Sequence, residues 1–227
     1  MKGDCMSLKK LLALLALPVA AVFVVAGCAS PAPTKTDDKK DTDSSESTTD
    51  DEAEVDEAPA DGELAEPGTR VGIDTWLTYS FTTTDDEEAL LSARLKSVEP
   101  VTKAQLEFLN TTFDEGQLKG YDVWMILVEE KKVSGATVEF NADYSFFDIV
   151  DKDGNKVQEI TVIGWDECKT PSFDDEYDTA GGTLTQCFLA ASTPGGNAPA
   201  GVAYTGGYEE GNPYDSFDGK PLLFIKD

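Results

Sequence analysis

The sequence predicts an all-β fold, an antiparallel β-sandwich of two packed sheets, preceded by a disordered acidic linker. Beyond Gly68, apolar residues alternate with polar ones in short runs that turn residues separate. This pattern is typical of sandwich strands rather than of helical bundles. Residues 29–67 contain no aromatic residue and are mostly Ser, Thr, Asp, Glu, Ala and Pro, a composition that cannot offset the entropy cost of ordering. The folded part is therefore expected at residues 68–227, long enough for one hydrophobic core.

Short apolar runs predict nine strands in this domain. They are expected at residues 73–81, 91–98, 121–130, 137–140, 145–150, 157–163, 183–190, 201–204 and 222–225. Residues 105–110, which follow Pro100, are expected to form a helical turn between two strands. Trp76, Trp124 and Trp165 lie within or beside the runs, so we expect core aromatics there.

Residues 1–28 predict a secretory signal. Lys9 and Lys10 precede an apolar run over residues 11–26, and small residues follow it, as at a cleavage point. The alternative is an uncleaved membrane anchor, for which a run of 16 residues is slightly short. The run ends in Val-Ala-Gly-Cys at Cys28, which resembles the lipobox of bacterial lipoproteins. That resemblance implies that Cys28 receives a diacylglyceryl thioether, becomes the mature N-terminus and anchors the protein to the extracellular face of the cell membrane.

Acidity pervades the chain after this segment. The net charge is -26, and residues 68–227 hold 29 acidic against 12 basic side chains. Such a domain repels phosphate backbones, so we expect no nucleic-acid partner. Cationic ligands, divalent ions and basic cell-wall components are compatible with this charge. Residues 29–67, with a reach of roughly 35 Å, are expected to lift the domain off the membrane, the alternative being an acidic docking segment.

Histidine is absent from the sequence. Its absence removes the usual general base near neutral pH and every Ser-His or Cys-His nucleophile arrangement. We therefore expect neither an enzyme nor a cofactor.

The cysteines predict one disulfide, between Cys168 and Cys187. Cys5 leaves with the signal and Cys28 is lipidated, so these two remain, and an isolated pair outside the cytosol is expected to be oxidised. Closing a loop of about 20 residues would contribute about 3 kcal/mol in the chain-entropy model and would pin the acidic segment 171–180. A redox role is the alternative, although redox pairs are usually closer in sequence.

Several segments resemble a known family: residues 94–100, the apolar strand at 121–128, the turn at 151–154 and the Gly-led strand at 181–188, followed by a closing strand at 221–225. Together with the lipobox and the acidic linker, they look like Gram-positive lipoproteins with an immunoglobulin-like, immunoprotective-antigen type extracellular domain, a family of unknown molecular function. The resemblance implies an immunoglobulin-like β-sandwich over residues 70–227 and an extracellular address, with no catalytic residues. The charged run at 129–132 departs from relatives, which often have an Asn-containing turn there.

The first functional hypothesis is a non-catalytic binding domain for a cell-wall, protein or glycan ligand. Its candidate contact residues are Tyr204, Tyr208, Tyr214 and Phe217, which are spread through a Gly-rich segment. Loops on a rigid scaffold often carry recognition. The alternative is that these aromatics fold back over an open end of the sandwich.

A second hypothesis is calcium or cation binding by the acidic runs at 85–88 or at 174–176 with Asp178, since hard cations prefer carboxylates. Residues 151–155 open like a calcium loop but lack the Gly and Glu that an EF-hand needs further on, so a hairpin turn is the favoured interpretation. We assign no metal ligands. A hydrolase with paired carboxylates is the least supported hypothesis, because no acid and base stand out.

Overall fold

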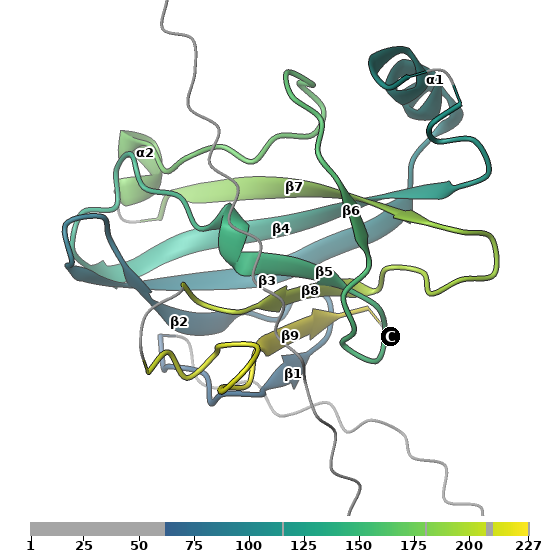
Figure 1. Ribbon diagram of the computed structural model, residues 1–227. Helices are drawn as coiled ribbons and strands as arrows, with labels where there is room; N and C mark the ends of the chain where they lie inside the picture. Colours follow the sequence, from purple (N-terminus) through teal and green to yellow (C-terminus); the bar gives the residue numbers. More distant parts are fainter. Residues whose placement is uncertain (1–61, 115, 180, 208–210, 227) are drawn as a thin grey trace, which may run out of the picture. The chain divides into compact units, whose positions relative to one another are not determined.

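The computed structural model describes residues 62–114, 116–179, 181–207 and 211–226 (Figure 1). They belong to one compact unit. The expected signal peptide at 1–28, with the expected lipid site Cys28, and nearly all of the expected linker lie outside the described residues. Within the described residues, no helix is both long and apolar enough to cross a membrane.

Two sheets form the domain, and the expected all-β sandwich is confirmed. The four-stranded sheet has the order β1 (Arg70–Val71), β9 (Leu222–Ile225), β8 (Gly201–Tyr204) and β5 (Phe147–Val150). The five-stranded sheet has the order β2 (Leu77–Thr82), β3 (Glu88–Pro100), β4 (Asp122–Gly135), β7 (Thr183–Ser192) and β6 (Gln158–Ile160). Figure 1 shows β4 and β7 as the long central strands, with β8, β9 and β1 in the layer below.

The strand order is immunoglobulin-like. Strands β3, β4, β7 and β6 in one sheet and β9, β8 and β5 in the other follow the seven-strand order of an immunoglobulin constant-type sandwich. Two strands are additional: β2 extends the larger sheet, and β1 lies beside β9. The expected antiparallel pairing holds except between β1 and β9, which run parallel.

The structure differs from the expected strands at the crossing between the sheets. Residues 137–140 form a turn, not a strand. Val138 is buried there, and its N–H donates to Asp178 Oδ1 at 2.8 Å, so a side chain takes the place of a neighbouring strand. Phe140 has a positive φ of 65°, which a strand residue does not adopt. The apolar alternation of this segment thus reflects burial without sheet pairing.

Strand β4 continues through the charged run at 129–132. Glu129 is in an ion pair with Arg94 on β3, Lys131 stands over the Trp76 ring at 4.5 Å from its centroid, and Glu130 points inward and is fully buried. The strand therefore accommodates these charged residues through an ion pair, a cation–π contact and a buried site. The packed domain also starts earlier than residue 68, because Ala65 is buried and its N–H donates to the Thr78 carbonyl at 2.8 Å.

Between the sheets lies the main core, which is rich in aromatic side chains. Phe147 on β5 packs its ring near those of Tyr79, Phe188, Tyr204 and Phe224, with centroids 5.2–6.5 Å apart. These rings come from both sheets, so they join the two layers. Alternation along each strand places them inward, as a half-buried strand requires.

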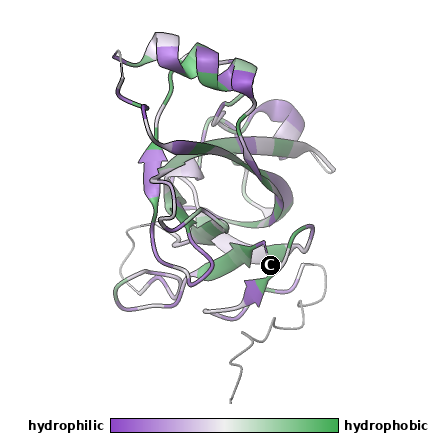
Figure 2. Ribbon diagram, turned by 90° about the vertical axis from the view of Figure 1, so that its right-hand side faces the viewer, coloured by the Kyte–Doolittle hydropathy of each residue, from purple (hydrophilic) through white to green (hydrophobic). Residues whose placement is uncertain are grey.

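A second apolar cluster covers the outer face of the five-stranded sheet. Helix α1 (Lys103–Thr112) extends the expected helical turn and begins with a capping box between Thr102 and Gln105, which satisfies two free N–H groups of the first turn. Leu109 is buried against the sheet, and Phe108 stacks on Trp165 with centroids 5.3 Å apart. Figure 2 shows α1 on the side of this sheet that faces away from the smaller one.

Candidate binding cleft

An open cleft of about 670 Å³ lies beside the edge strands β5 and β6. These strands end their respective sheets and follow each other in the chain. Its lining includes the apolar side chains of Phe147, Ile160, Val162, Ile163, Pro171 and Leu189. A concave, partly apolar site with a few polar groups is the usual form of a ligand site.

The cleft exists because β6 is short. Ile160 is the last residue of β6 to pair with β7, opposite Leu189. The chain then leaves the sheet and returns where Cys187 N–H donates to the Lys169 carbonyl at 2.8 Å. The loop between these points, 161–168, forms one wall, and Ile163 within it is 92% exposed.

The disulfide joins this wall to the sheet. Cys168 in the loop is bonded to Cys187 on β7, with Cα atoms 4.9 Å apart, so the expected pairing is confirmed. Both cysteines line the cleft and belong to the outer apolar cluster that includes α1. The bond therefore anchors the loop onto one sheet and does not bridge the two sheets.

Two carboxylates line the cleft, Asp148 on β5 and Glu159 on β6. Desolvation raises the pKa of Glu159, and the negative charge of Asp148 raises it further. Asp148 is ion-paired with Lys156, with Oδ2 and Nζ 2.7 Å apart, and the Lys156 side chain is 64% exposed. Lys169 also lines the cleft, but its Nζ is 2.6 Å from Asp166 Oδ1, so neither lysine pairs with Glu159 among the described residues.

The opposite wall carries Tyr144 and Ser145. Tyr144 begins the short helix η1 (Tyr144–Phe146), which leads into β5. Phe146 N–H donates to the Asp143 carbonyl at 2.7 Å, and Thr205 N–H donates to the Phe146 carbonyl at 2.8 Å. Backbone hydrogen bonds therefore hold this wall to Thr205, just after β8, and to Asp143.

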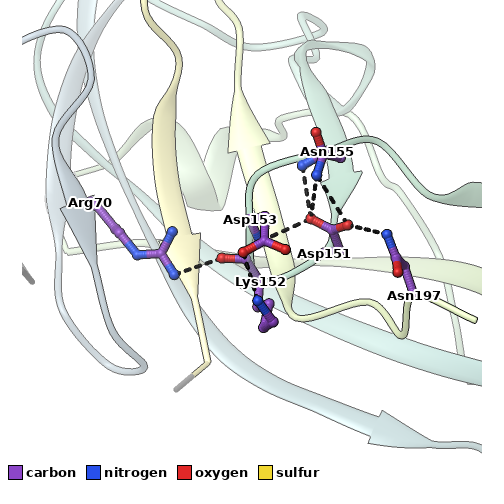
Figure 3. Close-up of polar contacts among 6 residues, drawn as sticks. All are labelled: Arg70, Asp151, Lys152, Asp153, Asn155 and Asn197. Atoms are coloured by element: carbon purple, nitrogen blue, oxygen red, sulfur yellow. Dashed lines mark hydrogen bonds and ion pairs between the residues drawn. The ribbon is translucent and has the colours of Figure 1, made fainter. Parts of the chain in front are cut away.

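Residues 151–155 form the hairpin turn that links β5 to β6, as the favoured interpretation expected. One oxygen of Asp151 accepts hydrogen bonds from the N–H groups of Asp153 and Asn155, both at 2.9 Å, and the other accepts from Asn197 Nδ2 at 2.7 Å (Figure 3). Desolvation opposes ionisation, but the donors of Asn155, Asp153 and Asn197 hold the pKa of Asp151 below its usual value. Its carboxylate is occupied by the turn, and Arg70 donates to the Lys152 carbonyl at 2.9 Å beside it.

Of the other two acidic runs, one is exposed beside a turn and the other caps a short helix. Residues 85–88 are exposed at and beside the β2–β3 turn, where Thr83 Oγ1 accepts from the N–H of Glu87 at 3.2 Å. Asp174 caps helix α2 (Asp175–Asp178) through the Tyr177 N–H at 2.8 Å. Asp178 lies 2.7 Å from Lys132 Nζ. No group of three or more His, Cys, Asp or Glu side chains among the described residues is arranged to hold a metal ion.

The four aromatics named as contact residues do not form one surface. Tyr204 and Tyr214 are buried, with ring centroids 5.8 Å apart, and Tyr214 Oη donates to the Ala65 carbonyl at 3.0 Å. These two therefore fold back into the domain, which is the alternative that the sequence left open, and they offer no ligand surface. Phe217 is 92% exposed. Tyr208 lies outside the described residues.

Sequence reasoning missed a buried polar cluster around Glu130 and Asp143. Both carboxyl groups are fully buried, and Tyr79 Oη contacts both. A signal existed: Glu130 continues the inward phase of Ile126 and Val128 along β4. The surrounding run of charges made it look like a solvated strand end.

The chain matches no protein-family model, no curated protein and no solved structure. The resemblance to immunoprotective-antigen type lipoproteins therefore stays a prediction.

Proposed function

We propose that this protein is a lipid-anchored, non-catalytic binding domain at the extracellular face of the membrane, and that the cleft beside β5 and β6 holds an apolar ligand carrying a positive charge. The observation that carries the binding proposal is the cleft itself, about 670 Å³ in volume, with apolar walls and two carboxylates.

Charge favours a cationic group on the ligand. Desolvation, and then the negative charge of Asp148, raise the pKa of Glu159, so a cation placed beside Glu159 would favour its ionised form. The Lys156 side chain that now balances Asp148 is largely exposed, and exposed ion pairs contribute only about 0–1 kcal/mol. A ligand ammonium can therefore replace Lys156 at little cost. The excess of acidic residues over the whole domain attracts the same ligands over longer distances.

The disulfide supports an extracellular address. Disulfides persist in oxidising compartments and are rare in the cytosol, and the Cys168–Cys187 bond is part of the fold. The lipobox-like sequence ending at Cys28 supports the lipid anchor. A lipid at Cys28 would precede the acidic segment 29–67, which would connect the lipid to the domain.

Binding is tested with dansylcadaverine, a primary ammonium joined to an apolar fluorophore. Changing Asp148→Asn together with Glu159→Gln should weaken its binding by about tenfold or more, since two partly exposed charge contacts of roughly 1 kcal/mol each are lost. Fluorescence titration measures the dissociation constant. The control is Asp153→Asn, which removes an exposed carboxylate from the same hairpin but outside the cleft and should leave the constant unchanged. Equal binding by all three proteins would refute the cleft as the site.

Lipidation is tested by labelling cells with radioactive palmitate. The wild-type protein should incorporate the label, and Cys28→Ala should lose it and accumulate at the precursor mass, because no thiol remains to accept the lipid. Cys5→Ala is the matched control and should still be labelled and processed, since Cys5 is expected to leave with the signal. An unlabelled wild-type protein, or a Cys28→Ala protein that keeps the label, would contradict the anchor.

A further inference from the structure

Two carboxyl groups lie against each other in the core at one end of the sandwich. Glu130 on β4 and Asp143, just before η1, are both 0% exposed. Tyr79 Oη on β2 lies 2.8 Å from Asp143 Oδ2 and 3.2 Å from Glu130 Oε1 and donates toward both. This phenol has one proton to give, so it cannot satisfy the pair fully.

The remaining oxygens indicate that the pair shares a proton. Among the described residues, Glu130 Oε2 and Asp143 Oδ1 have no partner with hydrogen-bond geometry, although the Gln186 side chain is near enough to Glu130 to lower its pKa in part. Two ionised carboxylates would face each other there without compensation, which is very costly in a buried site. A proton on Glu130 removes one charge and supplies the missing donor. Burial, and then the charge of Asp143, raise the pKa of Glu130 well above its usual range.

As the pH falls, Asp143 is the second carboxyl group of the pair to take up a proton. Burial raises its pKa to about 6, although hydrogen bonds from Tyr79 and Glu130 lower it in part. Three further polar side chains belong to this environment: Tyr177 on α2, Gln186 on β7 and Tyr204 on β8 beside Tyr79. Lys132, two residues beyond Glu130, is ion-paired with Asp178.

The pair is directly connected to the cleft. Asp143 is followed by Tyr144 and Ser145, which form one wall. On the other side, Gln186 Nε2 donates to the carbonyl of Pro171, another lining residue, at 3.2 Å. Movement of the Tyr144–Ser145 wall away from the core would therefore carry Asp143 toward water.

We propose that the Glu130–Asp143 pair makes this wall of the cleft proton-sensitive, so that mild acid locks the wall onto the core and neutral pH releases it. This inference rests on the proposed function only in taking the cleft as the binding site. The carboxyl pair and its connection to Tyr144 are observed in the structure.

Proton linkage gives the direction of the effect. With the wall closed, Asp143 holds its proton up to about pH 6. With the wall open, its pKa returns to about 3.9, so opening releases a proton between these values. Opening therefore becomes more frequent as pH rises through this window, by up to about tenfold per pH unit and about a hundredfold from Asp143 alone.

Native-state hydrogen exchange measures this opening without any ligand. Observed rates for the Tyr144–Phe147 amides, divided by the intrinsic rate at each pH, should show protection falling by about a hundredfold from pH 4 to pH 7. Asp143→Asn, which cannot ionise, should flatten this dependence. Asp153→Asn, which removes an exposed carboxylate from the turn after β5 and outside the cleft, should keep it. Amides of α1 serve as the internal reference.

Tyr79→Phe provides an independent variant if Asp143→Asn fails to fold. Loss of the phenol removes a donor that lowers the pKa of Asp143, so the change in protection should move to higher pH. Protection that is independent of pH in the wild type, or an unchanged profile in a folded Asp143→Asn or Tyr79→Phe protein, would overturn the inference. None of these hydrogen-exchange results depends on dansylcadaverine binding. The proton-sensitive wall and the binding role of the cleft can therefore be refuted separately.

Discussion

Replacing Phe147 with Ala should lower the free energy of unfolding by about 4 kcal/mol, the usual range for truncating a buried Phe being about 3–5 kcal/mol. Phe147 is 3% exposed, and its ring lies near Tyr79 and Phe188 of one sheet and Tyr204 and Phe224 of the other. The cavity left behind therefore lies between the layers, where neither sheet alone can close it. Urea denaturation followed by circular dichroism measures the loss.

Phe217→Ala is the matched control for this prediction. The same atoms are removed, but Phe217 is 92% exposed, so its loss should change the free energy of unfolding by no more than about 0.5 kcal/mol. If the two variants were equally stable, the two-layered core around Phe147 would be wrong.

Removing the disulfide should have the second largest effect. Changing both Cys168 and Cys187 to Ala should lower the free energy of unfolding by about 3 kcal/mol, because the bond restricts an unfolded loop of about 20 residues. Both thiol positions are buried in the outer cluster with Trp165 and Leu109, so lost packing acts in the same direction. Thermal unfolding of the wild-type and the double variant gives the difference.

Reducing the disulfide separates the contribution of the covalent bond to stability from that of the packing of the two side chains. Dithiothreitol should destabilise the wild-type domain by nearly the same amount and leave the double variant unchanged. A wild-type protein indifferent to dithiothreitol would show that the loop from Cys168 to Cys187 is held by packing alone.

The fold class could be predicted because alternation marks strands that have one face in a core. Strands β2 to β9 each overlap an expected run, since alternation along a strand marks one face in a core. The disulfide could be predicted because Cys5 and Cys28 both lie in the expected signal segment, which leaves Cys168 and Cys187 as the remaining pair. The fold class follows from a local pattern and the disulfide from a count of cysteines, and neither requires knowledge of the tertiary structure.

Tertiary contacts decided the features that could not be predicted. Strand β1 is two residues long, too short to show an alternation of apolar and polar residues. It forms because it can pair with the edge of β9. Residues 137–140 alternate like a strand but are held by Asp178. Glu130 reads as a surface charge, and its partner Asp143 is 13 residues away in the chain. The cleft depends on where the β6–β7 loop leaves the sheet, which no residue type specifies.

The pairing of the first strand with the last bears on how the domain would withstand force. Arg70 and Val71 run in the same direction as Leu223 and Phe224, so tension applied before β1 and after β9 would slide these strands lengthwise past each other. Their hydrogen bonds span the gap between the strands and would be strained together, not one at a time. The short β1–β9 pair would therefore resist tension applied to the two ends of the domain, and the Leu64–Thr78 bridge would add resistance just ahead of β1.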